Sequence, residues 1–159
     1  MLNRILAKTL LTAFAVATLV SCKKDDKDPA NVITDANGLK TSISWTSTAT
    51  SPSNIDLDIY LYQGTGSNKT STNYYSNSST GSSETFTLPN TLADGDYTVT
   101  VDYFDVPAAG KINFSFAGNS ANGATYSIND VNFTTTQDGT EPDVIKINKS
   151  GNKYTVTKL

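Results

Sequence analysis

Two carboxylates alternate with apolar residues in the stretch NIDLDIYLY, which runs from Asn54 to Tyr62. Asp56 and Asp58 are two positions apart, so on a β-strand they share a face and lie roughly 6.5–7 Å from each other. That separation overlaps the range of about 6.5–9.5 Å between the two carboxylates of inverting glycosidases. Such a pair also needs a cleft that raises the pKa of one carboxyl, and an open sheet face provides no such desolvation. Catalysis by this pair is therefore disfavoured.

The composition removes most other catalytic chemistry. The chain contains no histidine and one cysteine, Cys22. Histidine is the usual general base near neutral pH, so triads that depend on it are excluded, as are zinc sites built from histidine and cysteine. We therefore predict a protein that is not an enzyme.

The carboxylates also suggest calcium, which takes six to eight oxygen ligands. Asp56 and Asp58 lie on one predicted strand, and Asp102 lies on another. If those strands are neighbours, the three carboxylates form a candidate calcium site.

Tyrosines give a third interpretation of the same strand. Tyr60 and Tyr62 share the face of the two aspartates, and these four side chains form one predicted exposed stripe. Tyr74 and Tyr75 interrupt a Ser, Thr, Gly and Asn-rich segment at residues 63–83. Aromatic rings beside carboxylates suit a sugar-binding surface. Tyrosine is also common in cross-strand pairs, where it covers a sheet without binding anything. Both alternatives stay open on the sequence alone.

Nearly every apolar residue after residue 34 follows a period of two, which predicts strands, and no window has the spacing of an amphipathic helix. Proline and Asp-Gly, Asn-Gly or Ser-Gly pairs separate the runs. This pattern predicts an antiparallel β-sandwich, jelly-roll or immunoglobulin-like, of seven to eight strands. The predicted strands are residues 39–45, 55–62, 85–88, 97–104, 111–117, two short pieces within 124–133, 144–147 and 154–156, with a further edge strand around 73–77.

The N-terminus has the features of an export signal. Arg4 and Lys8 precede an apolar run at residues 9–20, which is shorter than the roughly 20 residues needed to span a bilayer. The ending Leu-Val-Ser-Cys at Cys22 resembles the lipobox of bacterial lipoproteins. That resemblance implies a signal peptide at residues 1–21 that is cleaved before Cys22, and lipid on the Cys22 thiol and amine. Each acyl CH₂ adds about 0.8 kcal/mol of membrane affinity, so several chains give stable anchoring.

A charged tether follows the lipidated cysteine. We assign residues 22–34 to this tether and residues 35–159 to one folded domain. The run KKDDKD at residues 23–28 resembles the signal that directs some Gram-negative lipoproteins to the cell surface, which implies an outer-membrane protein facing the exterior. Without Arg4 and Lys8, the chain keeps 10 basic against 15 acidic residues, a net charge of −5. Scattered lysines on an acidic chain exclude nucleic acid as a partner.

The domain resembles the bacterial pre-peptidase C-terminal domain. The resemblance rests on Ile43-Ser-Trp45, on DLDIYLY at residues 56–62 and on LADGDYTVTV at residues 92–101, in that order. It covers residues 39–116, about half the chain. It implies a β-sandwich of a kind that in some members binds polysaccharide or extracellular matrix and in others calcium. Residues 118–159 add strands outside this pattern.

Together these features predict a non-catalytic binding module, anchored to the membrane through Cys22, for extracellular carbohydrate or protein. The alternative is a structural subunit of a cell-envelope complex with no soluble ligand.

Overall fold

The computed structural model describes residues 30–70, 81–121 and 123–159, and the backbone of residues 75–77. The predicted signal peptide, the lipidation site Cys22, residues 23–29 of the predicted tether, and Tyr74 lie outside these described residues.

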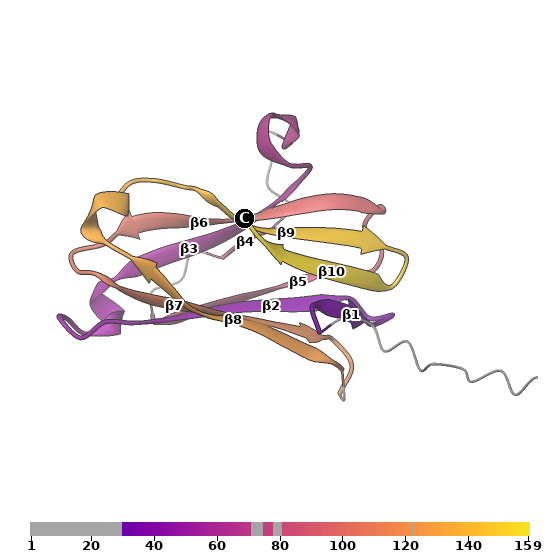
Figure 1. Cartoon of the computed structure of the whole chain (residues 1–159), viewed down its shortest axis with the longest axis horizontal. Coiled ribbons are helices and arrows are strands. Elements are labelled where there is room, and N and C mark those ends of the chain that lie inside the picture. The colour runs from indigo at the N-terminus through magenta and orange to yellow at the C-terminus, as the bar shows by residue number, and fades with distance from the viewer. Residues whose placement is uncertain (1–29, 71–74, 78–80, 122) are drawn as a thin grey trace, which may run out of the picture.

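The described residues form two antiparallel sheets packed face to face, as predicted (Figure 1). Sheet A has six strands in the order β1-β10-β9-β6-β3-β4, and sheet B has four in the order β5-β2-β7-β8. The strands are β1 (Val32–Thr34), β2 (Leu39–Thr46), β3 (Asp56–Gln63), β4 (Tyr75–Asn77), β5 (Ser83–Leu88), β6 (Gly95–Asp105), β7 (Gly110–Gly118), β8 (Thr125–Phe133), β9 (Asp143–Ser150) and β10 (Lys153–Lys158).

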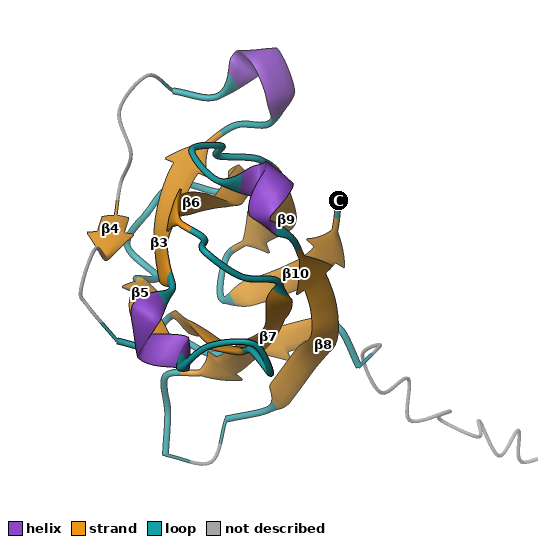
Figure 2. Cartoon of the chain, turned by 90° about the vertical axis from the view of Figure 1, so that its left-hand side faces the viewer, coloured by secondary structure: helices purple, strands orange, loops and turns teal. Residues whose placement is uncertain are grey.

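The connections contain short helical turns, and the described part of the chain has no α-helix. Figure 2 shows these turns in the loops that connect the strands. They are η1 (Pro52–Asn54), η2 (Gly66–Asn68) and η3 (Thr135–Gln137). No helix among the described residues has the length and apolar character that crossing a bilayer requires.

The period-two pattern predicts the core correctly. Ile55, just before β3, and the alternate residues Leu57, Ile59 and Leu61 of β3 are at most 1% exposed. They meet the inward residues of β2 and β7 across the space between the sheets. Trp45 is the largest of the inward residues, and its indole N–H donates to the backbone oxygens of Pro52 (3.0 Å) and Ile55 (3.1 Å). These two bonds fix the turn η1 against the core.

One strand replaces the two short pieces predicted at residues 124–133. In β8 the apolar alternation shifts by one residue between Ile128 and Val131, which is what an extra residue in a strand produces. The pairing with β7 shifts at this point, and Asp130 has a φ of 57°. The break in the pattern is therefore a β-bulge and not the end of a strand.

A strand that the sequence assigned to the tether begins the domain. β1 pairs antiparallel with β10, also contacts β7 and β8, and buries Ile33 completely. A run of three residues is too short to show alternation, which is why the pattern missed it. Directly after β1, the Asp35 carboxylate accepts hydrogen bonds from the N–H of Asn37 (2.7 Å), the N–H of Ser120 (2.9 Å) and the hydroxyl of Ser120 (2.9 Å). This carboxylate joins the β1–β2 turn to the loop that follows β7.

Candidate functional site

The two outer faces of the sandwich are the places where polar side chains gather. The sequence directed attention to the outer face of sheet A, where β3 and β6 are neighbours. Asp58 lies directly opposite Asp102, Tyr60 opposite Thr100 and Tyr62 opposite Thr98. The structure thus brings together two of the three predicted calcium ligands.

The predicted exposed stripe is wrong at its centre, because Asp58 is only 6% exposed. The hydroxyl of Tyr60 donates to its Oδ2 at 3.4 Å. Burial raises the pKa of the Asp58 carboxyl above its ordinary value, and the charges of Asp56 and Asp102 raise it further. Burial likewise raises the pKa of Asp102, with added repulsion from Glu141 and Asp56. This face therefore carries carboxylates that take up protons more readily than free ones.

The calcium prediction receives no support from the described residues. Within them no three acidic, histidine or cysteine side chains are arranged to hold a metal ion. Asp56 lies opposite Asp105, beyond a shift in register that separates it from the Asp58–Asp102 pair. The charge of Asp56 nevertheless acts on Asp58 and Asp102, and the three carboxylates are not arranged to hold a metal ion.

Tyr60 and Tyr62 are partly buried, and both bond to neighbours on the same face. Burial is the main reason why each phenol has its pKa raised to about 12, followed by the charge of Asp58 for Tyr60 and a hydrogen bond with Glu141 for Tyr62. The Lys69 ammonium lies 5.0 Å from the centre of the Tyr62 ring. These tyrosines are neutral hydrogen-bonding groups within a packed network.

The two threonines of β6 opposite these tyrosines are fully buried. Thr98 donates to the carbonyl of Gly64 (2.7 Å), and Thr100 donates to Glu141 Oε1 (2.6 Å). Much of the arrangement of Tyr60 and Tyr62 is thus explained if these side chains simply cover the sheet, which is one of their two interpretations. Tyr75 begins β4, with its backbone opposite Leu61. The predicted sugar-binding role of the tyrosines stays a prediction.

The outer face of sheet B presents a different surface, made of small polar side chains. One row of hydroxyl residues crosses all four strands, because consecutive partners lie opposite one another. The members of this row, in strand order, are Thr85, Ser42, Ser115 and Ser127. A parallel row contains Ser83, Ser44 and Asn113. The sheet therefore holds hydroxyl and amide groups in register over its full width.

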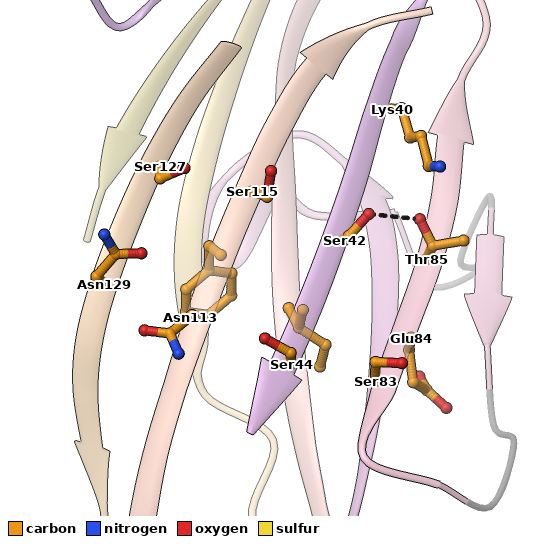
Figure 3. A pocket seen from close by; sticks show the side chains of 12 residues that line it. Lys40, Ser42, Ser44, Ser83, Glu84, Thr85, Asn113, Ser115, Ser127 and Asn129 are labelled. Carbon is orange, nitrogen blue, oxygen red and sulfur yellow. Dashed lines mark hydrogen bonds between the residues drawn. The ribbon is translucent and has the colours of Figure 1, made fainter. Parts of the chain in front are cut away.

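A hollow of about 360 Å³ opens over these rows. We call it the sheet B groove and define it by its outward-facing polar lining: Lys40, Ser42, Ser44, Ser83, Thr85, Asn113, Ser115, Ser127 and Asn129. Figure 3 shows these side chains spread across the face, with a hydrogen bond of 2.7 Å joining the hydroxyls of Ser42 and Thr85. Most of the lining stays exposed to solvent.

No family model, curated protein or solved structure matches the chain. The arrangement of its own residues is what indicates a function.

The sheet B groove suits a ligand with many hydroxyls. Serine and threonine hydroxyls both donate and accept, and the asparagine amide does the same through separate atoms. A ligand that itself alternates donors and acceptors, such as a sugar, can pair with this lining from several directions.

Sequence reasoning missed this site. The serines of β2, β7 and β8 lie in predicted strands at polar positions between the apolar ones, and Ser83 lies just before the strand predicted at 85–88. Their polarity suggested only a solvated surface. The signal was the absence of large or charged residues at Ser42, Ser44, Asn113 and Ser115. That signal becomes meaningful only when the order of the strands is known.

Proposed function

We propose that this chain is a lipid-anchored lipoprotein of the Gram-negative outer membrane that faces the exterior and binds extracellular carbohydrate without catalysis. The ligand-binding surface is the sheet B groove. The observation that carries this proposal is the row of four hydroxyl residues in register beneath a hollow of about 360 Å³. Binding sites are concave and place a few polar groups where they fix a ligand's orientation.

Ser115→Val and Ser127→Val are expected to weaken glycan binding. Each change removes one hydroxyl and keeps a residue that favours strands, so the fold is retained. The loss of one hydrogen bond is worth about 0.5–1.5 kcal/mol, or about two- to tenfold in affinity. Glycan-array screening followed by calorimetry with the strongest ligand measures the change.

The matched control is Thr157→Val, which removes an exposed hydroxyl from β10 of the other sheet and should leave the affinity unchanged. Loss of binding in Tyr60→Ala or Tyr62→Ala, with the serine variants unaffected, would move the site to sheet A. Co-purification with one fixed envelope protein and no glycan signal would instead identify the structural subunit predicted as the alternative.

Cys22→Ser is expected to abolish membrane retention, because the hydroxyl cannot replace the thiol that carries the first lipid. The variant should appear as unprocessed or soluble protein when membrane and soluble fractions are separated. Processing of the wild-type chain and its labelling with a fatty-acid analogue serve as the control. Normal retention of Cys22→Ser in the membrane fraction would contradict the lipid anchor. Exposure of the wild-type protein at the cell surface is tested separately, by protease treatment of intact cells.

A further inference from the structure

A second hollow of about 280 Å³ adjoins the sheet B groove. It is lined by Thr46 of β2, Lys111 of β7 and Asn132 of β8, together with the loops that flank these strands. Thr46 lies opposite Lys111, and this outward pair directly follows the pair of Ser44 and Asn113 that lines the first hollow. The two hollows therefore follow one another along β2 and β7.

The length of this combined surface exceeds one sugar ring. Outward residues of β2 from Lys40 to Thr46 line it, and six residue steps in a strand cover about 20 Å. The surface is a sheet face open to solvent, so the ends of a long ligand need not fit inside it. A surface of this shape can bind sugar units in the middle of a polysaccharide as well as the unit at its end.

The charge on this face is opposite to that of the whole chain. The chain has a net charge of −3, yet the outward side chains of the described strands of sheet B include two lysines, Lys40 and Lys111, and one carboxylate, Asp130. Lys111 pairs with Asp130 at 2.9 Å, and Lys40 forms no ion pair with any described residue. The Lys40 ammonium is thus an exposed positive charge at one end of the groove.

Two carboxylates lie beside this surface among the described residues: Asp130, which pairs with Lys111, and Glu84, which points away from it. Glu84 is 3% exposed and accepts a hydrogen bond from the backbone N–H of Ile59 in sheet A at 3.0 Å. Its neighbours Ser83 and Thr85 point outward, as the alternation of β5 requires. Negative charge on a ligand in the groove therefore faces Lys40 and is separated from Glu84 by the sheet.

We infer that the two hollows together bind an extended segment of an acidic polysaccharide, lying along β2 and β7, with Lys40 pairing with a carboxylate or sulfate of the sugar chain. This inference rests on the proposed function, because it names the class of carbohydrate and the way it lies. Lys40 is a specificity-determining residue, and the serines and asparagines bind hydroxyls that neutral and acidic sugars share.

The test uses the full chain, solubilised in detergent, with galacturonate oligomers and neutral galactose oligomers of two, four and six units. Affinity is expected to rise from the dimer to the hexamer, and the acidic hexamer should bind more tightly than the neutral one. Lys40→Gln should lower affinity for the acidic hexamer by about fivefold, the upper end for an exposed ion pair, and leave the neutral hexamer unchanged. Raising the salt concentration should erase the same difference.

Lys158→Gln is the matched control, because it removes an exposed lysine from sheet A. Affinity that stops rising at the dimer, or equal affinity for neutral and acidic hexamers, would overturn the inference while leaving carbohydrate binding intact. Absence of binding to any oligomer and to any glycan on an array would overturn the proposed function itself. A loss caused equally by Lys158→Gln would show that the charge of the whole chain, and not Lys40, governs binding.

Discussion

Trp45→Ala is expected to remove a large part of the stability of the domain. Trp45 is 1% exposed, and truncation of a buried tryptophan costs about 3–5 kcal/mol. Domains of this size have a free energy of unfolding of about 5–15 kcal/mol, so the variant is marginal or unfolded. The indole N–H also bonds the carbonyls of Pro52 and Ile55, and η1 loses this attachment. Urea denaturation followed by circular dichroism measures the change.

Trp45→Phe separates packing from hydrogen bonding. It keeps an aromatic ring in the core and removes the N–H, so the two carbonyls lose that donor at a cost of about 1–3 kcal/mol. The smaller loss should be visible as a lower urea midpoint in a protein that still unfolds cooperatively. An unchanged midpoint for Trp45→Ala would mean that the β2 tryptophan is not a core residue.

Asp35→Asn and Asp58→Asn are expected to change the stability of the domain in opposite directions. Hydrogen bonds, led by the one from the Asn37 backbone, hold the pKa of Asp35 below its ordinary value. Its ionised form therefore stabilises the fold at neutral pH, and that contribution is lost as the pH falls through the lowered pKa. Asp35→Asn should lower the melting temperature at pH 7 by several degrees. In acid, the melting temperatures of the variant and the wild type should lie closer together.

Asp58 behaves in the opposite sense because its pKa is raised by burial and by neighbouring carboxylates. At neutral pH its charge costs stability, and the cost disappears as the pH falls below the raised pKa. Asp58→Asn keeps an oxygen for the Tyr60 hydroxyl and should raise the melting temperature at pH 7, with little effect in acid.

Differential scanning calorimetry between pH 3 and pH 7 measures both variants. Asp105→Asn, on an exposed residue of β6, is the matched control and should change little at any pH. A melting temperature that falls in Asp58→Asn would show that the ionised carboxylate has a stabilising partner.

The features that could be predicted from the sequence are those that depend only on residues close together along the chain. Alternation in residues 55–62 was enough to place Ile55, Leu57 and Ile59 in the core, because a strand turns successive side chains to opposite faces. The same rule predicted that Asp58 would be exposed, which is wrong, because partners from the surrounding sheet bury it. Exposure on the outer face depends on what lies across the sheet, which a single strand pattern does not contain.

The sheet B groove likewise could not be predicted from the pattern of single strands. Ser42 and Ser115 are 73 positions apart in the sequence and are directly opposite each other in the sheet. The sequence around either residue does not indicate that the other is its neighbour. Which residues are neighbours depends on the order of the strands in the sheet. The tyrosines drew attention because aromatic residues are conspicuous in a sequence, whereas a site made of serines is visible only after folding.

The hydrogen bonds between the Asp35 carboxylate and Ser120 bear on how the domain would respond to mechanical force. If the chain is tied to a membrane at Cys22 and to a polysaccharide on sheet B, as proposed, it is pulled from two points, and the tension enters the described domain at β1. β1 has only three residues paired with β10, which is a short ladder to resist pulling. The next attachment is the Asp35 carboxylate, which holds Ser120 in the loop between β7 and β8. Tension would thus enter sheet A at β1 and pass along the backbone into β2 of sheet B, with the Asp35 carboxylate holding the turn between them against Ser120. This attachment would weaken wherever acid protonates the Asp35 carboxylate.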